Sequence, residues 1–265
     1  MSEEQKSSTK RKRSTFGVVF LIIFLDMVGF SVIFPLFPDM LDYYLERESE
    51  GGILKSFVAS IEGMSFDADE STNQSFRFET VIFGGVLGSL YAVLQFFFAP
   101  IWGRLSDKYG RRPILLMTVG GTCLGYGLWV FAGSFWVLVL SRIVGGIASG
   151  NLSVATASIA DVTSRESRSK GMALVGVAFG LGFILGPALG GLASLVEPFG
   201  GDSQGAFVLN KFSLAAIISL ALGALNWFWL AKRFKETLPA EKRAEVNSPK
   251  PGIFKMGKVS NPAVR

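Results

Sequence analysis

The 265-residue sequence contains no histidine and one cysteine, Cys123. Histidine is the commonest metal ligand and general base, so its absence excludes histidine-based zinc sites and nucleophile–histidine pairs. A single cysteine cannot form an internal disulfide, and Cys123 lies in an apolar stretch where a small buried side chain is expected. The sequence also lacks a phosphate-binding glycine loop and any zinc-ligand spacing. It therefore predicts no enzymatic activity, no metal site and no cofactor.

Long stretches of the sequence also contain few charged residues. Hydrophobic residues make up 49% of the sequence and charged residues 18%. Nearly uncharged runs recur, and about 20 such residues cross the roughly 30 Å hydrocarbon core of a bilayer. The runs predict an all-α integral membrane protein with six transmembrane helices, at Phe16–Met40, Val81–Trp102, Ile114–Ala132, Phe135–Ile159, Gly171–Val196 and Phe212–Ala231.

Positive charges gather at alternate ends of these spans. Lysine and arginine are frequent in the N-terminus 1–15, in the connections between spans 2 and 3 and between spans 4 and 5, and in the polar segment 232–265. Positively charged connections stay on the cytoplasmic side. We therefore expect the membrane domain 16–231 to be part of a multi-pass protein of the cell membrane. Both termini are expected to be cytoplasmic, the last segment as a linker or tail. The basic N-terminus is explained by topology and anionic lipid rather than by nucleic acid.

The connection between spans 1 and 2, residues 43–79, falls on the opposite, outer side and is acidic. It is unusually long for a tight helical bundle. Within it, apolar residues recur at helical spacing, namely Ile53, Leu54, Phe57, Val58, Ile61 and Met64. This pattern predicts a short amphipathic helix on the outer membrane surface or over a cavity. The alternative is a disordered loop.

The connection between spans 2 and 3 reads GRLSDKYGRRP. Topology alone needs its positive charge but not its particular set of residues, which includes Gly103, Asp107, Gly110, Arg111 and Arg112. The two glycines permit a tight turn, and the aspartate can cap a helix or pair with an arginine. Asp161 ends span 4 on the same side of the membrane. We expect Arg111 to pair with Asp107 or with Asp161.

Two charged residues lie well inside spans. Asp26 is about ten residues into span 1, roughly 15 Å deep at 1.5 Å per residue, and Arg142 lies at a neighbouring depth in span 4. A charge at the helix centre costs about 2.5–3.5 kcal/mol on insertion scales and normally faces a partner or a water-filled cavity. The two residues form either a structural ion pair between spans 1 and 4 or a proton- or substrate-coupling site. The second interpretation is favoured because ionisable residues inside the membrane are usually functional.

Other polar residues of the spans are weaker candidates for lining a cavity. Each can equally be a helix–helix hydrogen bonder. They are Tyr91, Gln95, Asn151, Ser153, Thr156 and Asn226.

Span 5 carries glycines at four-residue spacing. Such a strip lets the backbone of another helix approach closely, and a proline within it removes one backbone hydrogen bond and can kink the helix. The residues are Gly182, Gly186, Pro187, Gly190 and Gly191. Close packing against a neighbouring helix is the simplest interpretation.

Three strings, in this order along the chain, resemble signatures of the major facilitator superfamily. GRLSDKYGRRP resembles the loop G-x-L-x-D-x-x-G-R-[RK] between the second and third helices. LVLSRIVGGIASG resembles the fourth-helix motif built around an intramembrane arginine, here Arg142. GFILGPALGG resembles G-x-x-x-G-P-x-x-G-G, the fifth-helix motif of drug:proton antiporters. FLDMVGFSVIFPLFP is similar to the tetracycline-efflux branch, and ETLPAEKRA to the animal tetracycline transporter-like proteins.

The resemblance implies a fold of twelve helices in two six-helix halves, each half built from two three-helix repeats. The chain would be the N-terminal half and would work with a second half, either a separate chain or a C-terminal part of a longer one. The Asp107 loop would gate transport by meeting a helix of the opposite half. The glycine strip of span 5 would act as a hinge or seal against that half.

The implied function is secondary active transport, with export of small drug-like, amphiphilic or anionic organic molecules by antiport with protons. In tetracycline carriers the third helix holds an acidic residue. Aligning on Arg142 puts Gly125 at that position, so a substrate other than tetracycline is expected. The alternative function is a non-transporting membrane scaffold that binds and regulates a partner.

Overall fold

The computed structural model describes residues 3–49, 51–62, 78–196, 198–199, 205–239, 241 and 243. Within these residues the chain is helical apart from turns and one isolated bridge between Ala132 and Phe207. The elements are α1 (Glu3–Ser31), η1 (Phe34–Leu36), α2 (Phe37–Arg47), α3 (Ile53–Glu62), α4 (Phe78–Tyr109), α5 (Arg111–Val130), α6 (Phe135–Ala148), α7 (Asn151–Val162), α8 (Arg165–Ser194) and α9 (Ser213–Arg233).

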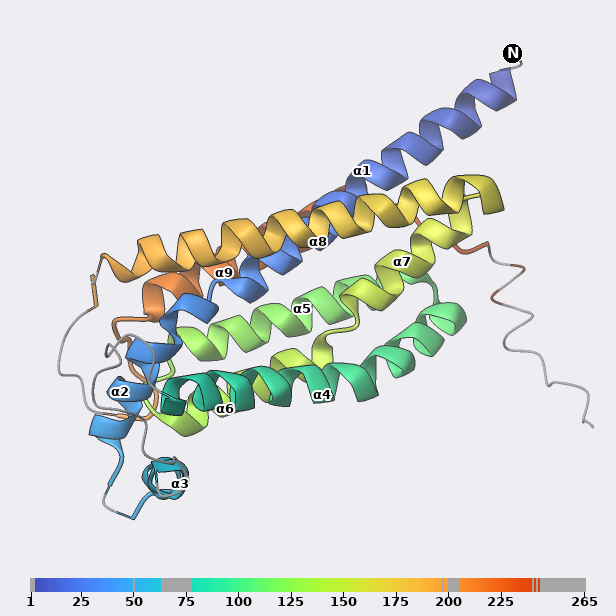
Figure 1. Ribbon diagram of the computed structural model, residues 1–265. Coiled ribbons are helices and arrows are strands. Elements are labelled where there is room, and N and C mark those ends of the chain that lie inside the picture. The colour runs from blue at the N-terminus through green and yellow to red at the C-terminus, as the bar shows by residue number, and fades with distance from the viewer. Residues whose placement is uncertain are drawn as a thin grey trace, which may run out of the picture.

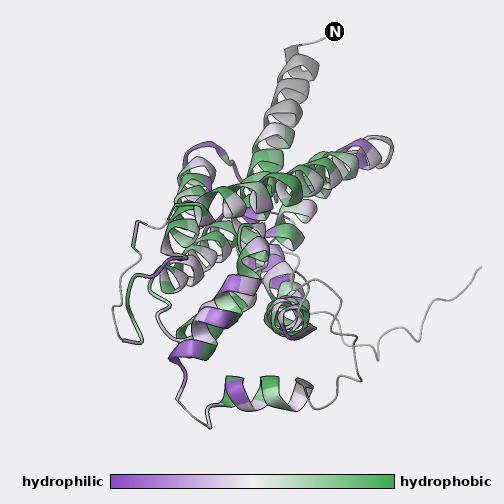
Figure 2. Cartoon of the chain, turned by 60° about the vertical axis from the view of Figure 1, so that its left-hand side comes forward, coloured by the Kyte–Doolittle hydropathy of each residue, from purple (hydrophilic) through white to green (hydrophobic). Residues whose placement is uncertain are grey.

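Six helical stretches are long and apolar enough to cross a membrane, and each overlaps one predicted span. They are Phe16–Arg47, Glu79–Tyr109, Arg111–Val130, Phe135–Val162, Ser167–Ser194 and Ser213–Arg233. The prediction of an all-α fold with six spans is therefore confirmed. Figure 1 shows the long helices side by side, with α8 along one edge of the bundle and α4 along the opposite edge. In Figure 2 the long helices are largely apolar, and α2 carries polar turns.

Several helices extend beyond the spans that hydropathy predicts. α1 already begins at Glu3, α4 continues to Tyr109, and α8 begins at Arg165. Most of the GRLSDKYGRRP string is therefore helical rather than a loop. Hydropathy marks only the part of a helix that lies in hydrocarbon. The backbone hydrogen bonds of the helix continue past that boundary wherever propensity allows.

Span 4 is interrupted, which the hydropathy pattern did not predict. α6 ends at Ala148, and α7 begins at Asn151 after two residues outside the helix. Trp102 of α4 packs into the break, where a Cβ on Gly150 would lie 2.5 Å from the Trp102 Cβ. The Trp102 indole also donates a 2.7 Å hydrogen bond to the carbonyl of Ile147. The carbonyls freed by the break are thus partly satisfied by α4, as buried backbone groups require.

A short helix, α3, lies in the long acidic connection, where the apolar spacing predicts one. Leu54 and Val58 are buried in the same cluster as Tyr44 of α2 and Phe83 of α4. α3 therefore packs on this end of the bundle, through two of the apolar residues that predicted it. The side chains of Ile61 and Met64 lie outside the described residues.

The buried apolar residues form two separate clusters along the spans. The cluster nearer α3 includes Ile33, Leu36, Tyr44, Trp129 and Leu138. The cluster nearer the α4–α5 turn includes Val19, Ile22, Leu115, Ile159 and Leu230. Buried polar residues lie between the two clusters along the helices, and we call them the polar band: Ser31, Thr122, Ser141, Arg142, Asn151, Ser219 and Asn226.

The glycine strip of span 5 packs against α1 of the same chain. A Cβ on Gly182 would lie 2.5 Å from the Met27 Cβ, and a Cβ on Gly190 would meet the Val32 carbonyl. The expectation that these glycines seal against a second half is therefore wrong for Gly182, Gly186 and Gly190, because α1 already occupies the strip. A Cβ on Gly191 would meet nothing within 4 Å, so this glycine lies away from the contact. The neighbouring Pro187 is half-buried.

The close approach of α1 and α8 yields a first prediction. In Gly186→Ala the new methyl would lie 2.6 Å from the Val28 carbonyl oxygen. We expect this overpacking to lower the free energy of unfolding by about 1–3 kcal/mol, measured as a lower thermal unfolding midpoint in detergent. Gly180→Ala is the matched control on the same helix, because its Cβ would meet nothing. Equal midpoints for the two variants would contradict this packing of α1 on α8.

Candidate functional site

Asp26 lies in α1, five residues before its last residue, Ser31, and at the level of the polar band. The amide Nδ2 of Asn151 donates a 2.8 Å hydrogen bond to Asp26 Oδ1. The same nitrogen is 3.3 Å from the hydroxyl oxygen of Thr122. Asn151 is 2% exposed, whereas Asp26 is only partly buried. The carboxylate therefore joins α1 to α7.

Arg142 is buried away from Asp26. Its side chain is 4% exposed, its guanidinium lies 5.1 Å above the Trp129 ring, and its Nε donates to Ser141 Oγ at 3.3 Å. Cation–π contact with a tryptophan stabilises such a charge in a dry site. Asp26 and Arg142 both lie in the described part of the chain and do not form an ion pair there. The structural ion pair between spans 1 and 4 is thus absent in this conformation.

Aromatic side chains from three helices meet beside Asp26. Phe30, one turn further along α1, has its ring centroid 4.8 Å from that of Tyr91 of α4 and 6.0 Å from that of Phe183 of α8. Phe179 stacks on Phe183 at 4.7 Å. We call these four residues the aromatic wall. Sequence reasoning found Tyr91 but missed the phenylalanines, although the spacing of four residues between Asp26 and Phe30 places both on one helix face.

A groove of about 590 Å³ lies between α4 and α7. Its polar lining comes from Gln95, Ser149, Ser153 and Thr156, and three of these were predicted from the sequence as cavity-lining candidates. The Gln95 amide donates to the carbonyl of Ser149 at 3.5 Å. The groove therefore borders the break in span 4.

Asn226 does not reach a cavity. It is 0% exposed, and its Nδ2 donates a 3.0 Å hydrogen bond to the carbonyl of Ile22. Of the two interpretations open from the sequence, the structure supports a helix–helix hydrogen bond between α9 and α1.

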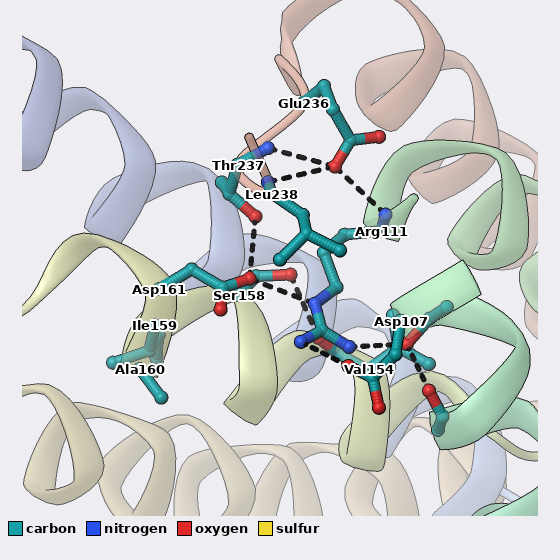
Figure 3. A network of polar contacts seen from close by, with 12 residues as sticks. Asp107, Arg111, Val154, Ser158, Ile159, Ala160, Asp161, Glu236, Thr237 and Leu238 are labelled. Atoms are coloured by element: carbon teal, nitrogen blue, oxygen red, sulfur yellow. Dashed lines mark hydrogen bonds and ion pairs between the residues drawn. The ribbon is translucent and has the colours of Figure 1, made fainter. Parts of the chain in front are cut away.

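Arg111 is the centre of a charged network at the α4–α5 turn (Figure 3). Its Nη2 is 2.7 Å from Asp107 Oδ1, and its Nε is 2.9 Å from Asp161 Oδ2. Its Nη1 also donates to Ser106 Oγ at 2.6 Å. Arg111 thus reaches both carboxylates that the sequence proposed as alternatives and ties the ends of α4, α5 and α7 together.

The two glycines of this string have different roles. Gly110 has φ +108° and separates α4 from α5, a conformation that side chains with a Cβ rarely adopt. Gly103 was expected to form part of a tight turn, which is wrong. It lies inside α4, where a Cβ would be 3.4 Å from Ser153 Oγ of α7, because the helix continues to Tyr109.

Glu236, just after α9, completes the network, and sequence reasoning missed it. Its Oε1 accepts the backbone N–H of Arg111 at 2.9 Å, and its Oε2 accepts that of Arg112 at 3.2 Å. The next residue, Thr237, donates to Asp161 Oδ2 at 3.4 Å. A carboxylate at a helix N-terminus satisfies free N–H groups and interacts favourably with the helix dipole. The signal in the sequence was an acid close behind the last span, which alone did not identify a partner.

Arg112 makes the reciprocal contact at the end of α9. Its Nη2 donates a 2.7 Å hydrogen bond to the carbonyl of Ala231, one of the last carbonyls of that helix, which have no partner within it. The start of α5 and the end of α9 therefore hold each other.

The resemblance to tetracycline carriers implies an acidic residue at the position of Gly125. A Cβ there would lie 3.1 Å from both the Cα of Gly145 and the carbonyl oxygen of Ser141. A side chain at this position would therefore require α5 and α6 to move apart by a few tenths of an ångström.

Comparison with known proteins places these features in a family. The profile described as Major Facilitator Superfamily matches residues 19–262. Human "Major facilitator superfamily domain-containing protein 10" is 37% identical over 239 residues, covering 88% of this chain and 47% of the relative. "Tetracycline resistance protein, class B" of Escherichia coli is 32% identical over 237 residues, covering 89% and 49%. The chain spans about half the length of the curated relatives it matches.

A solved structure shares the arrangement of the helices. It is the crystal structure of the human organic anion transporter MFSD10 (TETRAN), with a TM-score of 0.72 and 36% sequence identity. The match covers 88% of this chain and 50% of that one. The six spans therefore correspond to half of a known transporter fold.

The contact of Glu236 with α5 yields a second prediction. In Glu236→Gln the new NH₂ group would face a backbone N–H. Two donors would then oppose each other, and one of the two capping hydrogen bonds would be lost. We expect the first turn of α5 to lose about 1–3 kcal/mol of local stability, seen as faster amide hydrogen exchange at Arg111, Arg112 and Ile114. Glu241→Gln, at an exposed glutamate of the same segment, is the control. Unchanged exchange in Glu236→Gln would show that the carboxylate does not cap the helix.

Proposed function

This chain belongs to the major facilitator superfamily, and we propose that it forms the N-terminal half of a secondary transporter that exports small organic molecules in exchange for protons. The observation that carries the proposal is Asp26, a partly buried residue that places a carboxyl group inside a span and next to the aromatic wall. Intramembrane carboxylates of this kind commonly serve as proton relays in transporters.

Asp26 is well suited to carry the coupled proton. The sequence has no histidine, so a carboxylate is the side chain that can exchange a proton near neutral pH inside a span. Arg142 does not neutralise it, since the guanidinium lies over Trp129. A carboxylate that is held by one amide can gain and release a proton without breaking an ion pair.

The surroundings of Asp26 indicate the class of substrate. The aromatic wall offers stacking surfaces for an apolar ring system, and the neighbouring polar groups can orient its polar end. The human relative is named as an organic anion transporter and the bacterial relative as a tetracycline resistance protein. We infer drug-like amphiphiles, including organic anions, as substrates. The close backbone contact at Gly125 argues against tetracycline itself.

The charged network around Arg111 supports a gating role at the cytoplasmic end. We infer that this end and both termini are cytoplasmic, because the basic segments gather here and positively charged segments favour the cytoplasmic side. We also infer that the protein lies in the cell membrane. The Asp107 side chain is 45% exposed although it pairs with Arg111. Its carboxylate can therefore also meet the N-terminus of a helix from the second half, which attracts negative charge.

The uncovered surface supports a second six-helix half. α4 and α8 are the least buried of the six spans, and their exposed apolar side chains include Val86, Val93, Phe96, Phe97, Phe179, Ile184 and Leu192. Lipid can cover these residues, but it offers no hydrogen-bond partner to Asp26. The second half, as a separate chain or as a continuation of this one, would enclose the carboxylate in a cavity.

The rival function is a membrane scaffold that binds a partner without transport. Such a protein would use the same fold and the same uncovered face. It would have no use for an ionisable group in the middle of a span, which is costly to keep there. Asp26 therefore favours transport.

A third prediction tests coupling. Asp26→Asn keeps the size of the side chain and removes the proton site. In inside-out vesicles that contain this chain together with its second six-helix half, we therefore expect loss of proton-driven substrate uptake, with normal expression and thermal stability. Asp39→Asn, at an exposed carboxylate at the start of α2, should leave transport intact. Undiminished proton-driven uptake by Asp26→Asn would overturn the proposed role.

A fourth prediction concerns the second half. We expect the chain purified alone in mild detergent to be inactive after reconstitution, because half of the cavity is missing. Co-expression with a second six-helix half should give a complex that elutes as one particle and restores uptake. A stable monomer of this chain that transports by itself would disprove the requirement.

A further inference from the structure

We propose that Asn151 senses the protonation of Asp26 and transmits it to the interrupted span 4. The proposal rests on the proposed function in one respect, which is that Asp26 carries the coupled proton. Asn151 is a positioning residue here, acting through the carboxylate rather than on the substrate.

The amide of Asn151 faces Asp26 with its donor side. Nδ2 donates to Asp26 Oδ1 at 2.8 Å, which suits an ionised carboxylate because that group only accepts hydrogen bonds. The other end of the amide, Oδ1, is buried and has no hydrogen-bond partner among the described residues. A rotation of the Asn151 amide that exchanges the positions of Nδ2 and Oδ1 therefore breaks no hydrogen bond of Oδ1.

A protonated Asp26 favours the turned amide. Its O–H is a donor, so it needs an acceptor where Nδ2 now stands, and rotation about the Asn151 Cβ–Cγ bond brings Oδ1 there. The proton enters from water beside α1, binds one carboxylate oxygen and leaves to water again. No covalent bond of Asn151 changes in either direction.

Thr122 allows the amide to turn. Its hydroxyl now accepts from Nδ2 at 3.3 Å and donates to the Thr118 carbonyl at 2.8 Å. When Oδ1 takes the place of Nδ2, the hydroxyl can rotate and donate to it instead. The three side chains thus keep hydrogen bonds to one another in both protonation states, which a leucine or an alanine at position 151 could not provide.

The place of Asn151 in the fold connects this exchange to span 4. It is the first residue of α7, directly after the break that separates α7 from α6. α6 packs mainly on α4 and α5, whereas α7 also packs on α1 and α8. Protonation therefore alters the bond between α1 and the first turn of α7, beyond the break, where a helix segment can shift without carrying α6 with it.

Other titratable and polar groups also lie near Asp26. The titratable side chains close enough to feel its charge are Tyr91 of α4 and Cys123 and Tyr126 of α5. Arg142 of α6 interacts with both tyrosines. Beside this stretch of α1, α8 and α9 present the uncharged residues Gly182 and Asn226. Among the described residues, Asn151 is the hydrogen-bond donor that reaches the carboxylate.

The first test follows the protonation of Asp26 in the purified chain in nanodiscs. The infrared band of its protonated carboxyl is identified by its loss in Asp26→Asn and is titrated with pH. Hydrogen bonds to a charged group are about twice as strong as those between neutral groups, so we expect Asn151→Ala to move the midpoint upward by about one pH unit. Asn226→Ala is the matched control, since that buried asparagine donates to the backbone of the same helix one turn away.

The second test uses the parent protein with ¹⁵N-labelled asparagine and requires no folded Asn151 variant. The Asn151 side-chain amide signal should change with pH at the same midpoint as the Asp26 band, and should not change in Asp26→Asn. An equal shift of the midpoint in Asn151→Ala and Asn226→Ala, or an Asn151 signal that ignores pH, would overturn the proposal. If both tests succeed while Asp26→Asn transports normally, the sensing stands and the coupling role of Asp26 fails.

Discussion

Hydrocarbon offers no hydrogen-bond partner, and this constraint determines how the six spans fit together. Every buried polar group must be satisfied inside the protein, and three of the hydrogen bonds between helices meet on α1. Asn226 of α9 donates to the Ile22 carbonyl, Asn151 of α7 to Asp26, and the Ser31 hydroxyl lies 3.1 Å from the Gly182 carbonyl of α8. Apolar packing drives association only weakly in lipid, so the polar band gives the bundle its specificity.

The two charged centres of the protein obey this constraint in opposite ways. Arg111 is satisfied by Asp107, Asp161 and Ser106 at once, and Glu236 holds the backbone of the same turn. Asp26 has a single amide donor among the described residues and is only partly buried. A fully satisfied network is rigid, whereas a partly satisfied one can change partners. The network around Arg111 therefore suits a rigid contact whose bonds break together. The surroundings of Asp26 suit a site that exchanges protons and substrate.

Local patterns in the sequence predicted what depends on local chemistry. Hydropathy located all six spans, and the depth of Asp26 and Arg142 within their spans was enough to mark both as unusual. Two partners were not predicted, because they are distant in sequence: Asn151 lies 125 residues from Asp26, and Glu236 lies 125 residues from Arg111. The contact of Arg111 with Asp161 was predicted because both lie at the same end of their spans. The spacing of the glycine strip predicted a close helix contact, but the family resemblance assigned that contact to the second half instead of α1. The break in span 4 was missed because Ser149 and Gly150 are compatible with a continuous membrane helix.

The distance between Asp26 and Asn151 has a consequence for biosynthesis. Chains are made from the N-terminus, so span 1 enters the bilayer with its carboxylate long before the ribosome has produced the asparagine that will hold it. Span 1 must therefore insert into the bilayer without the hydrogen bond from Asn151. It has the highest mean hydropathy of the six spans. The apolar residues around Asp26 are thus needed during synthesis as well as in the folded protein. They offset the cost of inserting the carboxyl group before α7 has been made.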